Sequence, residues 1–314
     1  MQEQEAPAAQ QAPAAQQAPA TEQKETKHII VGKTYRLIKK IGEGSFGKIF
    51  LARHKETNQE VAIKLVKQSG SNEVNHELII YSKIKDVKYI PSLYASGTEG
   101  QFNYIVMELL EQNLDQLLSS YGKTLLLPVV IHLGLQMLKI IESIHLKGVI
   151  HRDIKPANFL LKTNAQNISE LYLIDFGLST SFLDERNKHI QMKTNERLIG
   201  TPRYMSVNTQ QNITPSRRDD LESLGYILIY LHKGELPWQA QGQAQRVEQG
   251  QAQRVEQAQQ EKSFAIKQDF GWAYNNTIIG EFILFIQYCR NLKFTDEPNY
   301  EYLRNILTNL ARIL

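Results

Sequence analysis

Two hydrophobic patterns follow one another along this chain, and their order most constrains its fold. From about Tyr35 to Leu110, apolar residues alternate with polar ones or are β-branched, as in EVAIKLVK and NYIVMELL, which indicates short strands joined by turns. A helical segment around Glu73 to Ile84 interrupts these strands. The sequence therefore predicts a β-rich lobe over about residues 31–110.

Helical spacing replaces the strand pattern after Leu110. The segment LLLPVVIHLGLQMLKIIESIHLKG places polar residues among apolar ones at roughly helical intervals, with Pro128 near its start and Gly148 at its end. Two further apolar helices are expected in LESLGYILIYLHKGELPW and EFILFIQYCRNL. We therefore predict an α+β fold whose α-helical lobe spans about 111–314, with a ligand cleft at the junction near 109–113.

Two segments lack the large apolar residues that a packed core requires. From Met1 to about Lys27 the chain is Ala, Gln, Pro and Glu in a near-repeat, and we assign residues 1–30 to a disordered tail. The stretch from about 239 to 260 contains GQAQRVEQ twice in tandem. We interpret this stretch as a solvated Gln-rich loop insertion, with a partner-binding arm as the alternative.

Composition narrows the functional classes. Hydrophobic residues make up 42% and charged residues 22%, and the net charge is +3, which argues against wholesale binding of nucleic acid or membranes. Cys289 is the only cysteine, which excludes an intrachain disulfide and a redox or zinc role. We find no secretory pattern and no uninterrupted apolar run long enough to cross a bilayer. We expect an intracellular monomer, in the cytoplasm, the nucleus or both.

A glycine-rich segment, IGEGSFGKI, lies between two strand-like runs. Its G-x-G-x-x-G pattern would need a following helix in a dinucleotide-binding fold, whereas a flap over ATP phosphates needs a strand on each side. The flanking strands favour the flap, and an ordinary glycine-containing hairpin is the alternative. The residues expected to contact the nucleotide here are Ile41, Gly42, Glu43, Gly44, Ser45, Phe46, Gly47 and Ile49.

A lysine ends the aliphatic run VAIK of a later strand. Lys64 could reach the α- and β-phosphates of ATP, although a surface lysine on an edge strand would look the same. In the helix that follows, Glu77 is placed to pair with Lys64 and hold its ammonium group toward the phosphates. Glu73, one turn earlier, is the competing partner.

The segment HRDIKPANFL, followed by LYLIDFGL, resembles the catalytic and metal-binding loops of protein kinases. This resemblance implies that Asp153 orients or accepts the proton of the substrate hydroxyl and that Lys155 neutralises the γ-phosphate. Asn158 and Asp175 would hold Mg²⁺, because oxygen ligands suit that ion. The implied fold is the bilobal protein-kinase fold, with ATP and Mg²⁺ bound in the cleft.

Downstream motifs resemble the casein kinase I family over about residues 35–314. In GTPRYMSVN, Ser206-Val207-Asn208 occupies the place where most protein kinases carry Ala-Pro-Glu, and RRDDLESLGY and YCRNLKFTDEPNYEYLRNIL fit the same family. The resemblance implies a serine/threonine protein kinase. It also implies a nucleotide pocket with Ala62 and Leu160 around the adenine, Met107 at its back and Glu108 to Leu110 as the hinge. Asp220 would hold the catalytic-loop backbone, and Thr201 would sit against Asp153 and Lys155.

Casein kinase I enzymes favour Ser or Thr in protein substrates that carry acidic or already phosphorylated residues. Arg203 matches one basic position that such a preference needs, and Arg197 lies nearby. Two departures stand out: Glu196 replaces a usual lysine, and AQGQAQRVEQ replaces a usual basic stretch. Arg246, Arg254 or Lys262 are the candidate substitutes. The family resemblance also implies activity without phosphorylation of Thr180, Ser181 or Thr194, although Arg152 before Asp153 leaves such control open.

Other readings of the sequence are a catalytically weak kinase-fold scaffold, a tau-tubulin-kinase-like enzyme and a small-molecule kinase. A scaffold predicts missing catalytic residues, yet Lys64, Glu77, Asp153, Lys155, Asn158 and Asp175 are all present. The segments around Arg203 and Arg217 favour a protein substrate over a small molecule.

Overall fold

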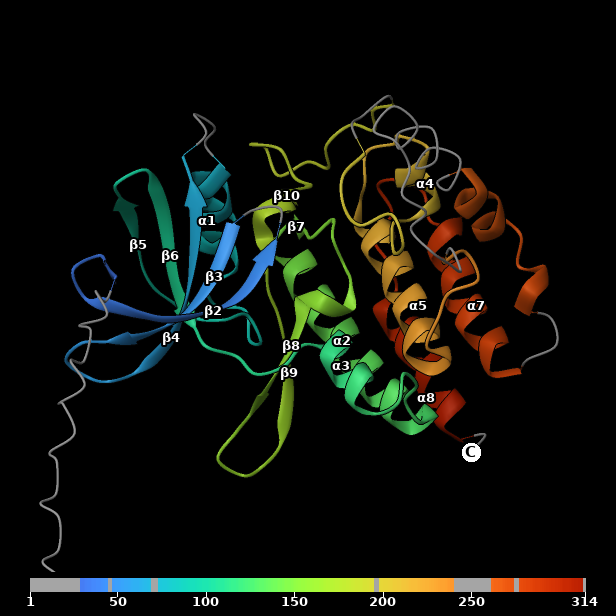
Figure 1. The fold of residues 1–314 in the computed structure, drawn as a ribbon. Helices are drawn as coiled ribbons and strands as arrows, with labels where there is room; N and C mark the ends of the chain where they lie inside the picture. The colour runs from blue at the N-terminus through green and yellow to red at the C-terminus, as the bar shows by residue number, and fades with distance from the viewer. Residues whose placement is uncertain are drawn as a thin grey trace, which may run out of the picture.

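The computed structural model describes residues 29–44, 47–68, 73–194, 198–239, 261–273 and 277–312. Strands gather in one lobe and helices in the other, as Figure 1 shows, so the predicted two-lobed α+β architecture is confirmed. Residues 1–28 of the predicted tail and 240–260 of the predicted insertion lie outside the described residues. β1 begins at Ile30, the last residue assigned to the tail.

The β-rich lobe is built on a sheet with strand order β1-β2-β3-β4-β6-β5, in which neighbouring strands are antiparallel. Helix α1, Glu73–Ile84, spans the helical segment expected from the sequence. The strands are β1 Ile30–Val31, β2 Tyr35–Gly44, β3 Gly47–His54, β4 Glu60–Lys67, β5 Leu93–Glu99 and β6 Phe102–Glu108.

Successive side chains of β4 point alternately into the core of this lobe and toward the cleft. Ile63 is fully buried in a cluster with Val106 of β6 on one face of the sheet. Ala62 packs on the opposite face with Met107, which is its partner in the β4–β6 register. Successive residues of a strand point to opposite faces, so Lys64 shares the face of Ala62. The strand therefore delivers Lys64 to the cleft.

Long helices form the second lobe around one apolar core. α3 packs against α5 and α8, and α5 packs against α7. The helices are α2 Leu114–Ser120, α3 Leu127–Leu146, α4 Val207–Gln210, α5 Arg217–Lys233, α7 Thr277–Asn291 and α8 Tyr300–Arg312, with a further helix over residues 261–268. Among the described residues α3 is also long and apolar enough to span a membrane by length and composition, but 56% of that window is buried inside the molecule, as in a core helix.

Short elements line the cleft side of the helical lobe. β7, Val149–Ile150, pairs with β10, Thr180–Ser181, and β8, Phe159–Thr163, pairs with β9, Ser169–Leu173. Two 3₁₀ turns, η1 at Pro156–Asn158 and η2 at Phe176–Leu178, lie next to these strands, and a third, η3, spans Gly271–Ala273. These short paired strands therefore flank the loops that the sequence marked for catalysis.

Candidate active site

A cavity of about 670 Å³ lies between the lobes, over the segment that joins them. Eight of the residues expected to line a nucleotide pocket do line it: Ile41, Gly42, Ile49, Ala62, Met107, Glu108, Leu110 and Leu160. Sequence reasoning missed others, among them Leu51, Ala157 and Ile174. Leu51 could have been found, because strand alternation puts it on the same face as Ile49.

The segment that joins the lobes is anchored to β8. The backbone N–H of Glu111 donates to the Leu161 carbonyl at 2.9 Å, and the Leu161 N–H donates to the Gln112 carbonyl at 3.0 Å. The Glu108 carboxylate bonds Lys162 of β8 and accepts from the Ser92 N–H. Leu110 lies between these anchors, so the backbone beside the cavity has a defined path.

A second cavity of about 280 Å³ adjoins the first and is lined by charged residues and glycines. The β2–β3 hairpin covers it, with Gly44 paired to Gly47, whereas Ser45 and Phe46 lie outside the described residues. Gly47 has φ +138°, and a Cβ there would lie 2.4 Å from the Leu65 carbonyl oxygen. The other predicted site residues that line this second cavity are Gly42, Glu43, Ile49, Lys64, Glu77, Met107, Lys155, Asn158 and Asp175. The hairpin therefore needs glycine at Gly47 in order to close over this cavity.

Lys64 joins two carboxylates at the centre of the second cavity. Its ammonium lies 2.8 Å and 2.9 Å from the two oxygens of Glu77 and 2.8 Å from Oδ1 of Asp175. Burial alone would lower the pKa of Lys64, but the charges of Glu77 and Asp175 raise it above its ordinary value. The same ammonium offsets the effect of burial on Asp175, whose pKa is lowered. The cavity therefore holds a fixed cation between two anions.

An aromatic stack couples α1 to both catalytic segments. The ring of Phe176 lies 5.1 Å from that of Tyr81 on α1 and 5.1 Å from that of His151, edge to face in both pairs. His76 of α1 also donates from Nε2 to the Ser179 carbonyl at 2.7 Å. Since Glu77 lies between His76 and Tyr81, these contacts fix the helix turn that holds Lys64.

Asp153 is almost fully buried and contacts Lys155 and Asn158, two residues that line the second cavity. Its carboxylate accepts hydrogen bonds from Lys155 Nζ and, at 2.7 Å, from the Thr201 hydroxyl, while Lys155 also donates to Thr201 Oγ1 at 3.2 Å. Asn158 Nδ2 donates to the Asp153 carbonyl at 2.9 Å. Thr201 therefore lies against both Asp153 and Lys155, as the family resemblance implied, and Asn158 contacts the same aspartate.

The loop that carries Asp153 is held from below by α5. Asp220 accepts from the backbone N–H groups of His151 at 2.7 Å and Arg152 at 2.9 Å. Arg152 has φ +67°, a left-handed conformation that non-glycine residues seldom adopt. Burial would raise the pKa of Asp220, but these donors and His145 lower it, so the group is ionised. The carboxylate therefore fixes a strained turn immediately before Asp153.

A buried histidine extends this support, and sequence reasoning missed it. His145 Nε2 lies 3.0 Å from Asp220, and its Nδ1 lies 2.7 Å from the Tyr300 hydroxyl of α8. Burial lowers the pKa of His145. A neutral imidazole that donates from Nε2 and accepts at Nδ1 satisfies all three groups. His145 and Tyr300 are 155 positions apart in the sequence, so no local pattern could reveal the contact between them.

Asn158 and Asp175 are suited to a hard divalent cation. Because Asn158 Nδ2 is bonded to the Asp153 carbonyl, its oxygen is the atom left to act as a ligand, and Asp175 adds carboxylate oxygens in the same cavity. Among the described residues no group of three or more His, Cys, Asp or Glu side chains forms a metal site. Mg²⁺ is commonly held by one or two protein groups together with phosphate oxygens and water, so these two residues fit it.

Of the basic residues proposed to bind the substrate, the structure describes Arg203 and Lys262. Arg203 is exposed, and its guanidinium lies 5.9 Å from the ring centroid of Tyr204. Burial raises the pKa of Asp115 on α2, and the positive charge of Arg203 opposes this rise, so the two side chains are near each other. Arg197, Arg246 and Arg254 lie outside the described residues, and Lys262 is exposed on the helix over 261–268.

Comparison with known families adds one finding to this geometry. A family model described as the protein kinase domain matches residues 35–305, which cover both lobes and every cavity residue named above.

Proposed function

This chain belongs to the protein kinase family, and we propose that it is a serine/threonine protein kinase of the casein kinase I type that uses Mg-ATP. The match supports phosphoryl transfer to proteins in general. The finer assignment rests on Ser206-Val207-Asn208 and on the RRDDLESLGY segment, which resemble casein kinase I.

The observation that carries this proposal is the arrangement of charges around one cavity. Lys64 is held by Glu77 and Asp175 in the cavity below the glycine hairpin, and Asp153 lies beside Lys155, which lines the same cavity. Phosphoryl transfer asks a protein mainly to position two reactants and to stabilise charge. A scaffold that had lost activity would have no need to keep these five residues in mutual contact or proximity.

Each residue has a role in the proposed reaction. Lys64 holds phosphate oxygens, and Glu77 keeps its ammonium in place. Asn158 and Asp175 would hold Mg²⁺, which neutralises phosphate charge when bound. Asp153 accepts a hydrogen bond from the incoming hydroxyl and orients it, while Lys155 offsets negative charge on the transferred group.

The proposal is tested by phosphate transfer from ATP to casein. We expect transfer by the wild-type chain and a loss of at least about a hundredfold in kcat for Asp153→Asn, with little change in the KM for ATP. Asp86→Asn, an exposed aspartate in the β-rich lobe, is the matched control. Unchanged turnover in Asp153→Asn would refute the mechanism, and ATP hydrolysis without transfer to any protein would favour a small-molecule kinase or a scaffold.

We also propose that acidic or phosphorylated residues near the acceptor are favoured through Arg203. This preference should be weaker than in a typical member of the family, because Asp115 already opposes the charge of Arg203 and Glu196 replaces a lysine. Arg203→Glu should reduce kcat/KM for acidic or primed peptides by about tenfold and leave neutral peptides within about twofold. Arg312→Glu, the same charge reversal at the end of α8, is the control. Equal losses on all peptides would contradict this role.

A further inference from the structure

The loop 201–205, which contains Arg203, is held from beneath by two side chains that the proposed mechanism does not use. Lys267 Nζ donates to the carbonyl oxygens of Pro202 at 2.9 Å and Met205 at 2.7 Å. Trp238 Nε1 donates to the carbonyl oxygen of Arg203 at 2.8 Å. The same loop begins at Thr201, which bonds Asp153. One end of the loop is therefore tied to the catalytic aspartate and the rest to Lys267 and Trp238.

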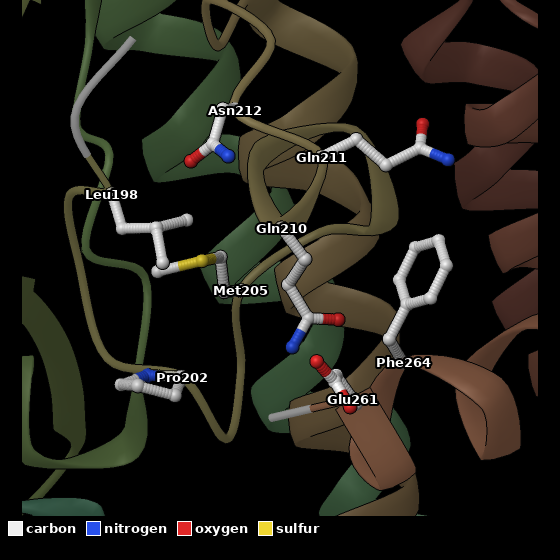
Figure 2. Close-up of a pocket in the computed structure, with 8 residues that line it drawn as sticks. All are labelled: Leu198, Pro202, Met205, Gln210, Gln211, Asn212, Glu261 and Phe264. Carbon is white, nitrogen blue, oxygen red and sulfur yellow. The ribbon is translucent and has the colours of Figure 1, made fainter. Parts of the chain in front are cut away.

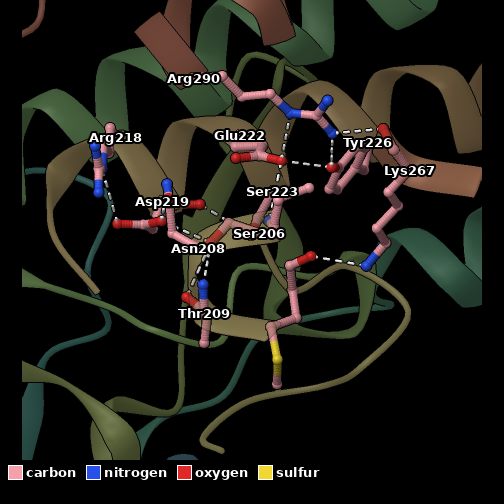
Figure 3. Close-up of polar contacts among 12 residues, drawn as sticks. Ser206, Asn208, Thr209, Arg218, Asp219, Glu222, Ser223, Tyr226, Lys267 and Arg290 are labelled. Carbon is pink, nitrogen blue, oxygen red and sulfur yellow. Dashed lines mark hydrogen bonds and ion pairs between the residues drawn. The ribbon is translucent and has the colours of Figure 1, made fainter. Parts of the chain in front are cut away.

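Lys267 is itself surrounded by residues of α5 and α7, and Figure 3 shows it beside Tyr226, Glu222 and Arg290. Its side chain is fully buried, and its ammonium lies 5.2 Å from the ring centroids of both Tyr226 and Trp238. Arg290 of α7 donates to the Lys267 carbonyl at 2.8 Å and to Glu222 of α5 at 2.9 Å. Two helices thus fix the position from which Lys267 reaches the loop.

Burying a lysine side chain at this position is energetically unfavourable unless its amino group makes hydrogen bonds there. Burial lowers the pKa of Lys267 to about 7, because the apolar surroundings disfavour the charged form. An apolar side chain of similar length would fill the same space without that penalty. Because the ammonium bonds two loop carbonyls, its contribution is to hold the loop rather than to fill the core.

The residues that Lys267 holds also form the wall of a surface pocket. Pro202 and Met205 line a cavity of about 290 Å³ beside Leu198, and Figure 2 shows the amide side chains of the 210–212 turn at its other side. Glu261 and Phe264, from the helix that carries Lys267, complete the lining. Because Thr201 contacts Asp153 and Pro202 follows Thr201, this loop lies beside the position at which a substrate hydroxyl would meet Asp153.

We propose that Lys267, assisted by Trp238, is a positioning residue for the polypeptide substrate, which acts by fixing the backbone of Pro202, Arg203 and Met205. This inference rests on the proposed function, because it concerns the acceptor and not ATP. Loss of Lys267 frees two carbonyls, so the loop samples conformations that bind a polypeptide poorly, while the nucleotide cavity keeps its walls.

The test compares Lys267→Met with the wild-type chain in casein phosphorylation. Lys267→Met should raise the KM for casein about tenfold, with kcat, the KM for ATP and casein-independent ATP hydrolysis within about twofold of the wild type. Lys233→Met, an exposed lysine at the end of α5, should leave the KM for casein unchanged. An unchanged KM for casein in folded Lys267→Met overturns the inference. A fall in kcat that matches a fall in the fraction of protein able to bind ATP also overturns it, because such a result indicates a structural role for Lys267.

If Lys267→Met does not fold, Trp238→Phe provides a second test of whether loop 201–205 positions the polypeptide substrate. It keeps an aromatic ring against Lys267 and removes the donor to the Arg203 carbonyl, so the KM for casein should rise about threefold with an unchanged KM for ATP. No rise refutes the proposed positioning. A wild-type chain that phosphorylates no protein would instead refute the proposed function, so the two failures are distinguishable.

Discussion

Substituting Asp220 by asparagine removes a charge that three donors share, without changing the size of the side chain. Oδ2 accepts from the His151 N–H and from His145, and Oδ1 accepts from the Arg152 N–H. Asparagine has one carbonyl oxygen, and its amino group would face one of these donors. If the oxygen keeps the two partners of Oδ2, the Arg152 N–H is left buried without an acceptor.

The size of the effect follows from these contacts. A buried donor without a partner costs about 1–3 kcal/mol, and losing the charge on the remaining bonds adds about 1 kcal/mol. The left-handed turn at Arg152 stores about 1–3 kcal/mol of strain, and relaxing part of it offsets part of this cost. We expect a net loss of about 1–3 kcal/mol in unfolding free energy, or a drop of about 2–6 °C in Tm for a domain of this size.

Two measurements distinguish this account from general damage to the fold. Thermal unfolding of Asp220→Asn at neutral pH should show the drop in Tm, and Asp86→Asn should stay within about 1 °C of the wild type. In chains that remain folded, kcat for casein should fall more than tenfold while the KM for ATP changes little, because only the loop before Asp153 is released. A drop in Tm below about 2 °C would refute the reasoning.

The pH dependence supplies a second check on the same variant. The pKa of Asp220 is lowered in the folded chain, so the folded state binds fewer protons than the unfolded state in acid. Its stabilisation is complete above the unfolded pKa of about 3.9 and is lost as the pH falls through the folded value. The difference in Tm between wild type and Asp220→Asn should therefore narrow below about pH 4, and a constant difference would contradict an ionised Asp220.

Two further variants test the cleft and the loop beside it. Glu77→Gln keeps the shape of the partner of Lys64 but removes its charge, so the KM for ATP should rise and kcat should fall, each by about tenfold in steady-state assays; unchanged ATP kinetics would contradict the pairing. Gly200→Ala would place a Cβ 2.6 Å from the Arg152 carbonyl oxygen at φ +106°, so kcat should fall more than tenfold. Gly100→Ala, which also has positive φ but open space around its Cβ, should lower Tm slightly and leave kcat unchanged.

Local patterns in the sequence were sufficient for the architecture and for much of the cleft. Strand alternation followed by helical spacing predicted both lobes, and α1 was expected at Glu73–Ile84, where it lies. The pairing of Lys64 was narrowed to two glutamates one turn apart, which helical spacing cannot separate. The contact with Glu77 depends on the docking of α1 through Tyr81 and Phe176, a tertiary feature that no local pattern contains.

Residues that support the site from a distance could not be found in the same way. Lys267 follows the apolar residues Phe264, Ala265 and Ile266 in a short segment after the Gln-rich stretch, and a lysine there ordinarily indicates a solvated surface, yet its side chain is fully buried. Its burial follows from acceptors on loop 201–205 and from rings on α5 and Trp238. Tyr300 of α8 meets His145 of α3 for a similar reason, because these two helices pack together. Such residues are determined by where distant elements pack.

The segment Ser206-Val207-Asn208, which stands in place of Ala-Pro-Glu, has no carboxylate of its own, and acidic residues of α5 bind it instead. Ser206 donates to Asp219 Oδ1 at 2.6 Å, and the Val207 N–H donates to Glu222 at 3.2 Å, so both residues are held from the helix below. Asp220, between these acids, holds the catalytic loop. One turn of α5 therefore holds both the catalytic loop, through Asp220, and residues 206–207, through Asp219 and Glu222. It acts together with the direct bond from Thr201 to Asp153, so α5 and this bond fix the catalytic loop relative to the loop 201–205 and the residues that follow it.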